Sequence, residues 1–249
     1  MSKEARDLSG KTALVTGAAK RLGRSIASAL ADRGAGVIVH YNTSADEARE
    51  LAARLENKAA AYTLQADLRD ESQARNLLDR AVKLAGPIDV LVNNAAVYGT
   101  GRLLDLTAGD LAENVQVNAF APLQIARCFA DQGRAGAIVN LLDAAVLDCD
   151  RSHAAYNLSK QMLLSLTRMM AVEFAPAVRV NAVAPGLILP ADGEDPSSLE
   201  RLVHTNLLGR VGNVEDVTDA VMFLLESSFV TGQVIFVDGG RHLKGYMPR

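Results

Sequence analysis

Short apolar runs alternate regularly with longer amphipathic stretches along the whole chain, and this rhythm leaves few folds open. We expect strands at residues 12–16, 37–40, 61–65, 88–92, 137–141, 178–183 and 234–237. We expect helices near residues 22–33, 44–56, 70–85, 108–131, 153–174 and 213–226. Most of the short runs are continuously apolar, which is typical of strands covered on both faces. The alternation therefore predicts an α/β fold with a doubly wound, seven-stranded parallel sheet and helices on both faces.

Length and composition place the chain among ordinary globular proteins. With 249 residues it can bury a large core, so we expect one domain over residues 1–249 that needs no disulfide or metal. A net charge of −3 and the absence of Trp argue against a nucleic-acid-binding protein. A charged N-terminus and the lack of any eighteen-residue apolar run predict no membrane span and a cytoplasmic protein. Cys128 and Cys149 form no zinc motif, and we expect them to be small buried or half-buried side chains.

One stretch interrupts the alternation of strands and helices. Residues 187–209 carry two prolines and a cluster of acidic residues. Long insertions in compact domains are often lids or binding loops, so we expect residues 188–208 to cover a ligand. The alternative is a solvated excursion of the chain with no function.

A glycine-containing turn, Thr16–Gly23, joins the first expected strand to the first expected helix. In open α/β sheets this turn holds the pyrophosphate of a dinucleotide at the helix N-terminus. Gly17 frees the backbone to approach the phosphate, and Gly23 lets the helix pack closely. The middle glycine of the usual fingerprint is missing, so the motif alone is weak, and a turn without a ligand is the alternative.

The end of the second expected strand, His40–Ser44, indicates which dinucleotide binds. NAD sites usually place an acidic residue there, and this chain has none. Thr43 and Ser44 can donate hydrogen bonds to a 2′-phosphate, and Arg21, with Lys20, can supply positive charge. The pattern predicts NADP(H); the alternative for Arg21 is a solvated cation at the start of a helix.

Two further strand ends fit the same cleft, because ligands bind at the carboxyl ends of parallel strands. Asp67 and Leu68 follow the third strand, where a carboxylate can accept from an adenine amine. Asn94, Ala95 and Ala96 follow the fourth, where small residues let the backbone approach a ribose.

A tyrosine and a lysine lie one helical turn apart in the segment Tyr156–Lys160. Positions i and i+4 share a helix face, and a nearby cation lowers the pKa of a phenol. Such a tyrosine can donate a proton near neutral pH. Alone this pair is usually a coincidence of the surface; it gains weight from following a dinucleotide-binding pattern.

Together these motifs resemble the short-chain dehydrogenase/reductase family over nearly the whole chain, and they occur in the family's order. The motifs are TGAAKRLG, NNAA, YNLSK, the Pro185–Gly186 turn, GRVGNVED and TGQ with VDGG. The resemblance implies a Rossmann fold in which Tyr156 is the general acid and Lys160 tunes its pKa and contacts the ribose. It also implies that Asn118 holds a proton-relay water, although an asparagine here can equally serve a helix kink. By resemblance we expect a homo-dimer or homo-tetramer.

Asp143 departs from the family pattern, which usually has a serine thirteen residues before the tyrosine. An ionised aspartate only accepts hydrogen bonds, so it suits a substrate with N–H donors, such as one reduced at C=N, better than a ketone. The alternative is an inactive variant, or one in which Asp148 or Ser152 takes over. The aspartate, the loop TGAAKRLGR and a strand end like HY-x-x-S resemble the pteridine reductases and the dihydromonapterin/dihydrofolate reductases.

That subgroup implies an aromatic ring, here Tyr98, which sandwiches the pterin against the nicotinamide; a loop-tip aromatic packed on its own lid is the alternative. Asn42 departs from the subgroup, which often has a base near the 2′-phosphate. The expected substrate contacts are Tyr98, Asp143, Tyr156 and Leu187. The expected cofactor contacts are Gly17, Lys20, Arg21, Leu22, Gly23, His40, Tyr41, Asn42, Thr43, Ser44, Asp67, Leu68, Asn94, Ala95, Ala96, Tyr156, Lys160, Pro185, Gly186 and Leu187.

The expected reaction is hydride transfer from NADPH to a C=N bond of a pterin or dihydropterin, with proton delivery by Tyr156. A carbonyl reductase of the same family, acting on a 3-oxoacyl thioester or a sugar ketone, stays open. So does a regulator that binds NADP without catalysis, although the intact tyrosine and lysine count against it.

Overall fold

The computed structural model describes residues 7–195 and 197–246, and it contains one seven-stranded sheet in the order β3-β2-β1-β4-β5-β6-β7. Every pair of neighbouring strands is parallel. The strands are β1 (Thr12–Val15), β2 (Gly36–Tyr41), β3 (Ala61–Gln65), β4 (Val90–Asn93), β5 (Gly136–Leu141), β6 (Val178–Pro185) and β7 (Val234–Val237). The expected fold class, a doubly wound parallel Rossmann sheet, is confirmed.

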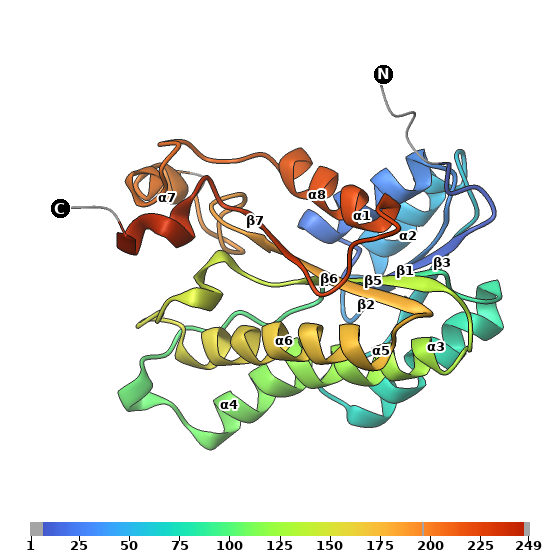
Figure 1. Ribbon diagram of the computed structural model, residues 1–249, viewed down its shortest axis with the longest axis horizontal. Coiled ribbons are helices and arrows are strands. Elements are labelled where there is room, and N and C mark those ends of the chain that lie inside the picture. The colour runs from blue at the N-terminus through green and yellow to red at the C-terminus, as the bar shows by residue number, and fades with distance from the viewer. Residues whose placement is uncertain (1–6, 196, 247–249) are drawn as a thin grey trace.

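Helices cover both faces of this sheet (Figure 1). They are α1 (Arg21–Asp32), α2 (Ala45–Leu55), α3 (Glu71–Ala85), α4 (Ala108–Val115), α5 (Ala121–Ala130), α6 (Ala154–Glu173), α7 (Ser197–Glu200) and α8 (Val214–Glu226). Successive strand residues point to opposite faces. Ala13 and Val15 therefore join the core under α1, α2 and α8, while Leu14 joins the core under α3 and α5. Burial on both faces explains why the strands are continuously apolar.

The helix expected over residues 108–131 is present, but it is not α-helical throughout. Its two parts, α4 and α5, are joined by a π-helical turn at Gln116–Phe120. Such turns often occur at functional sites. This turn contains the buried Asn118, whose Oδ1 accepts from Val97 N at 2.8 Å and whose Nδ2 donates to Val97 O at 3.0 Å.

The segment 187–209 has more local structure than a plain loop. It contains the short helix α7 and a 3-10 turn at Val203–Thr205, neither of which the pattern of residues predicted. Leu207 N and Leu208 N donate to Gly239 O, which ties the end of the segment to the turn after β7. Described residues of this segment thus rest on the sheet edge where the strands end.

Two expectations from composition can be compared with the structure. Cys128 is half-buried, as expected, but Cys149 is exposed, because it lies in the loop between β5 and α6 rather than in an element that packs on the core. Within residues 7–195 and 197–246, no helix is long and apolar enough to cross a membrane. Among the same residues no group of His, Cys, Asp and Glu could hold a metal ion.

Candidate active site

A cavity of about 590 Å³ opens at the carboxyl ends of the strands. It is bounded by the loop after β1, the ends of β2 to β6 and the first turns of α1 and α6. Parallel pairing brings these ends to one edge, which is why motifs far apart in the sequence meet there. The residues expected at the site that line the cavity are Gly17, Lys20, Arg21, Leu22, Gly23, His40, Asn42, Thr43, Asp67, Leu68, Asn94, Ala95, Ala96, Asp143, Tyr156, Lys160, Pro185 and Gly186.

The glycine turn forms a tight cradle whose shape depends on missing side chains. Gly17 has φ +63°, which favours glycine. A Cβ on Gly23 would overlap the Gly17 carbonyl oxygen and lie 2.5 Å from Asn94 Nδ2. Arg21 takes the place of the missing middle glycine with φ +55°, a conformation that costs a non-glycine residue about 1 kcal/mol or more. The turn therefore keeps its shape without the middle glycine.

Arg21 also connects this turn to the segment expected to form a lid. Its guanidinium donates to the carbonyl oxygen of Pro190. The described structure thus places the guanidinium between the cradle and residues 187–209, beside the cavity that both line. The strained backbone and the long-range contact together give Arg21 a defined position rather than that of a free surface cation.

His40 holds the glycine turn from below. Its ring is 1% exposed, and Nδ1 accepts from Gly17 N at 3.0 Å while Nε2 lies 3.1 Å from Ala66 O. An acceptor at Nδ1 requires the proton to be on Nε2, so both nitrogens are satisfied. Burial lowers the pKa of His40 to about 4, although the Ala66 carbonyl opposes this shift. His40 is therefore a neutral brace between the ends of β1, β2 and β3.

Asn94 acts in a similar way at the end of β4. Its Nδ2 donates to Thr16 O at 2.8 Å, and the N–H groups of Asn94 and Ala95 both donate to Thr16 Oγ1. The side chain braces the turn, and the backbone of the following small residues faces the cavity. Ala95 and Ala96 line the cavity, in agreement with the expectation that small residues here let the backbone approach a ribose.

The cations expected near a 2′-phosphate already have partners. Lys20 Nζ lies 2.8 Å from Glu47 Oε1, and the hydrogen bond with Glu47 raises the pKa of Lys20. Glu47 lies in the first turn of α2, two positions after the start of that helix. No pattern in the sequence singled out this carboxylate, which lies just beyond the strand end where NAD sites usually carry an acid.

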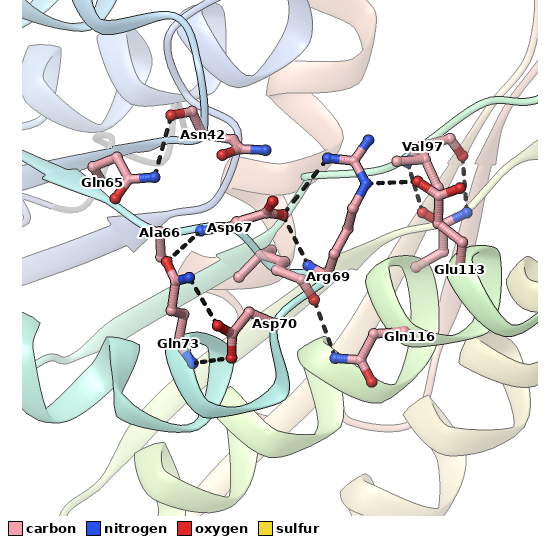
Figure 2. A network of polar contacts seen from close by, with 12 residues as sticks. Asn42, Gln65, Ala66, Asp67, Arg69, Asp70, Gln73, Val97, Glu113 and Gln116 are labelled. Atoms are coloured by element: carbon pink, nitrogen blue, oxygen red, sulfur yellow. Dashed lines mark hydrogen bonds and ion pairs between the residues drawn. The ribbon is translucent and has the colours of Figure 1, made fainter.

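A polar network surrounds the end of β3 (Figure 2). Asp67 accepts from Arg69 N at 3.0 Å, and Gln65 Nε2 donates to Asn42 O at 3.4 Å. Arg69 Nε donates to Glu113 Oε1 at 2.6 Å, which joins this strand end to α4. Arg69 lines the cavity and was not predicted, because a lone arginine four residues after a strand carries no recognisable signal.

Tyr156 and Asp143 meet at the other end of the cavity. Asp143 follows β5, and its Oδ1 accepts from Ala145 N at 2.8 Å, which leaves Oδ2 to accept from Tyr156 Oη at 3.2 Å. The expectation of a lowered tyrosine pKa is wrong for this structure. Burial, and then the Asp143 charge and hydrogen bond, raise the pKa of Tyr156 well above its ordinary value. Tyr156 is thus a protonated phenol at neutral pH, as a proton donor must be.

Lys160 is buried beneath this pair. It is 3% exposed, its Nζ donates to Leu141 O at 2.7 Å, and it lies 5.7 Å from the centre of the Tyr156 ring. Burial lowers the pKa of Lys160 to about 8, and the charge of Asp143 works against this shift. Lys160 is therefore a cation at neutral pH that titrates just above it.

Asn118 lies behind the site rather than in the cavity. Besides both bonds to Val97, its Nδ2 lies 3.0 Å from Ser159 Oγ, and Ser159 Oγ donates to the carbonyl of Tyr156 at 2.7 Å. The side chain thus links the loop after β4 to the first turn of α6. The bonds of the side chain are to Val97, Asn114 and Ser159, and the proton-relay role that the resemblance implies stays a prediction.

Tyr98 approaches Tyr156 edge-on, with ring centres 4.7 Å apart and planes at 86°. It does not line the main cavity but an adjoining one of about 360 Å³. Burial, followed by the charges of Asp150, Asp143 and Glu194, raises the pKa of Tyr98 to about 12. The phenol of Tyr98 is therefore neutral at pH 7, and several acidic side chains surround it.

Three other expected contacts lie elsewhere. Tyr41 packs against the core, Ser44 precedes α2 without a side-chain capping bond, and Leu187 lines a separate cavity of about 600 Å³. Tyr41 is turned away because strand residues alternate between faces. The cavity also has lining residues that the motifs missed; these are Arg69, Val97, Val117, Leu141, Leu142, Ile188 and Leu189. All but Val117 lie at the end of a strand or within four residues after one, which is a signal too broad to single them out.

Comparisons with known proteins agree with this geometry. The sequence profile described as enoyl-(acyl carrier protein) reductase matches residues 17–242. L-xylulose reductase of Mesocricetus auratus is 36% identical, over 94% of this chain and 97% of that protein. The chain belongs to the short-chain dehydrogenase/reductase family. It is therefore an oxidoreductase of that family.

Other family members are as similar and differ in substrate. Pteridine reductase 1 of Leishmania tarentolae is 35% identical, over 93% of this chain and 96% of that protein. The structure of FolM alternative dihydrofolate reductase 1 from Brucella canis complexed with NADP has a TM-score of 0.90 at 34% identity, covering 96% of this chain and 97% of that one. Sugar and pterin reductases thus stand equally near, and the family alone does not select the substrate.

Proposed function

We propose that this protein is an NADP(H)-dependent reductase that adds hydride and a proton across a C=N bond of a pterin or dihydropterin. The observation that carries the proposal is Asp143, which occupies the position next to Tyr156 where the family usually has a serine hydroxyl. A carboxylate at this point accepts hydrogen bonds from N–H groups and opposes the negative charge that develops on a ketone oxygen.

The cavity fits a dinucleotide cofactor. Gly17 and Gly23 leave a cradle that any Cβ on Gly23 would fill, and it opens at the N-terminus of α1, where phosphates bind. The end of β2 carries no carboxylate that would oppose a 2′-phosphate, and Thr43 lines the cavity beside it. Related structures crystallised with NADP support the choice. When bound, the nicotinamide supplies the hydride.

The protein's own groups supply the proton. Tyr156 holds its proton at neutral pH, and its hydrogen bond to Asp143 fixes the direction of the hydroxyl group. The cation of Lys160, beneath the phenol, stabilises negative charge that builds on the phenol oxygen as the proton leaves. Proton donation of this kind contributes roughly 10²–10⁴ in rate. Asp143 then orients the substrate by accepting hydrogen bonds from the substrate's N–H groups.

Two features close the substrate end. Tyr98 is half exposed beside Tyr156, and a flat heterocycle can stack on an aromatic face. Ile188 and Leu189, at the start of the expected lid, line the cavity, and Arg21 donates to the carbonyl oxygen of Pro190 beside them. A covering segment would exclude water during hydride transfer.

The test compares substrates in the wild-type enzyme and in Asp143→Ser. NADPH consumption is followed at the nicotinamide absorbance band with dihydrobiopterin and dihydrofolate, and in parallel with sugar ketones and 3-oxoacyl thioesters. We expect turnover of a pterin by the wild type, and we expect Asp143→Ser to lose pterin activity about tenfold or more while gaining ketone activity. Failure of every pterin to support turnover would sink the pterin assignment.

The second candidate is a carbonyl reductase, which the similarity to L-xylulose reductase favours. It predicts turnover of ketones by the wild-type enzyme and further improvement in Asp143→Ser. Binding of NADP(H) without turnover of any substrate in either panel would instead indicate a regulator that binds the nucleotide.

We propose a homo-oligomer as well. The outer face of α6 exposes Leu158, Met162, Met169 and Val172, which form a stripe on one long helix. Contiguous apolar surface of this kind marks protein contacts, and a second copy supplies the same stripe across a two-fold axis. Light scattering after gel filtration should give a dimer or tetramer, and Met169→Glu should shift the mass toward the monomer.

A further inference from the structure

Tyr98 does not stand alone at the tip of its loop, because His153 supports its ring. The two ring centres are 4.3 Å apart and their planes differ by 21°, which is a stacked pair. Tyr98 also contacts Tyr156, with the planes of the two rings at 86° to each other. Tyr98 nevertheless remains 51% exposed, so part of its ring is open to a ligand. One aromatic ring thus has a backing ring and a neighbouring proton donor at fixed positions.

His153 is itself held by a carboxylate. Its Nδ1 lies 2.9 Å from Asp150 Oδ2, while Asp150 Oδ1 accepts from Ser152 N at 2.7 Å and His153 N at 3.2 Å. Burial alone would raise the pKa of Asp150, but these hydrogen bonds hold it below its ordinary value. A charged carboxylate on Nδ1 removes the rotational freedom of the imidazole ring. The histidine can therefore act as a fixed support.

The backbone joins the same two segments. Gly101 N donates to Ser152 O at 2.7 Å and Ala154 N donates to Gly101 O at 3.0 Å, which forms a parallel bridge between Gly101 and His153. The loop after β4, which carries Tyr98, is thereby attached to the start of α6, which carries Tyr156. The stack and the backbone bridge link the aromatic ring to the helix that bears the proton donor, and the hydrogen bond to Asp150 holds the histidine in place.

We propose that the Asp150–His153 pair is a positioning element that holds the Tyr98 ring as a platform for a planar, nitrogen-containing heterocycle. The proposal rests on the proposed function for the identity of that heterocycle as a pterin. His153 acts through Tyr98 and does not touch the reacting atoms. It selects flat substrates, because only a flat ligand gains from a ring whose tilt is fixed beforehand.

The decisive variants separate the stacking of His153 on Tyr98 from the hydrogen bond between His153 and Asp150. His153→Ala removes both, His153→Phe keeps a stacking ring without the bond to Asp150, and Asp150→Asn weakens the hold on the imidazole. Asp148→Asn is the matched control, because it makes the same charge change on an exposed residue of the same loop. Each variant is measured for kcat and KM with dihydrobiopterin, for the Kd of NADPH, and for the Kd of oxidised biopterin by its own fluorescence with NADP⁺ present.

We expect His153→Ala to raise KM and Kd for the pterin about tenfold, in line with about 1.4 kcal/mol for lost stacking. The Kd of NADPH should stay within about twofold, because the nucleotide end is untouched. His153→Phe should restore pterin affinity to within about threefold, Asp150→Asn should lie between, and Asp148→Asn should match the wild type. Equal losses in the Ala and Phe variants, or equal losses for NADPH and pterin, would overturn the proposal.

Failure of the proposed function gives a different result. If the wild type reduces carbonyl compounds and not pterins, the same variants are compared on a planar aromatic ketone and on an aliphatic ketone. A loss confined to the planar ketone supports the platform with another substrate class. A loss common to both ketones, or no loss, or a wild type that binds no planar ligand at all, overturns it.

Discussion

The two ends of the cavity are built on different principles. At the nucleotide end the polar side chains are satisfied within the protein: both nitrogens of His40 are bonded, and the Asn94 amide braces Thr16. Next to the substrate end, in the adjoining cavity, Tyr98 is half exposed, and the His153 stack and a backbone bridge join its loop to the start of α6. A cofactor thus meets a preformed cradle, while a substrate meets a surface whose shape depends on side-chain contacts between loops.

Charge divides the ends in the same way. Near the β2 end the cation of Lys20 is already paired with Glu47. Around Tyr98 the charges of Asp150, Asp143 and Glu194 raise the phenol's pKa, opposed only in part by Arg241. A neutral heterocycle with several N–H donors suits the acidic surroundings of Tyr98. An anionic group suits the β2 end, where Lys20 lies. The difference in charge shows how the site can direct an anionic nucleotide to one end and a neutral heterocycle to the other.

Replacement of Tyr156 by Phe should have the largest effect, and only at the substrate end. The ring and its packing remain while the proton is lost, so kcat should fall by roughly 10²–10⁴. The Kd of NADPH, measured by fluorescence titration, should change less than about threefold. A comparable loss of NADPH affinity would show that the two ends are not separate.

Replacement of His40 by Asn tests the brace at the nucleotide end through stability against pH. The folded-state pKa of His40 is lowered from 6.5 to about 4, so between these values the unfolded chain takes up a proton that the folded chain refuses. Stability is therefore complete above pH 6.5 and is lost as the pH falls. By pH 5 the loss from this group is about 2 kcal/mol.

In His40→Asn this part of the pH dependence should disappear, although the shorter side chain lowers stability at pH 7 by losing the bond to Ala66. The measurement is urea unfolding of both proteins at pH 7 and pH 5. A parallel loss in the two proteins would contradict the prediction, because every group except residue 40 is common to both.

The pH profile of the wild type tests the charge of Lys160. Burial lowers its pKa to about 8, so the cation is present below that value and is lost as the pH rises through it. If the cation assists proton donation, kcat/KM should fall about tenfold per pH unit well above pH 8. Because Asp143 raises this pKa, Asp143→Ser should move the midpoint to lower pH. A midpoint unmoved by that substitution would contradict the assignment.

Release of Lys20 from its partner should give the smallest effect. Glu47→Gln frees the ammonium for a phosphate, so the KM for NADPH should fall about two- to fivefold while that for NADH stays unchanged. Glu50→Gln is the matched control, since Glu50 lies three positions further along α2 and pairs with Arg24 instead. Equal changes with both cofactors would place the pair outside the 2′-phosphate site.

Much of the scaffold could be read from local pattern. Each strand was expected within a few residues, because burial on both faces demands continuous apolar runs whatever the rest of the chain does. Parallel order then brings strand ends together, which is why most of the expected contacts line one cavity. The π-helical turn between α4 and α5 was not expected, and the Asn118 side chain within it bonds to Val97, 21 residues away, a contact that no local pattern shows.

Residue types and their spacing were therefore enough for the fold class and the family, and they also singled out Tyr156, Lys160 and Asp143, which line one cavity. Tertiary structure alone decided the positive φ at Arg21, the pairing of Tyr98 with His153, and the sign of the shift in the pKa of Tyr156. The physical reason is that periodicity records which face of an element is buried. Desolvation, stacking and ion pairing depend instead on which distant segments come to lie against that face.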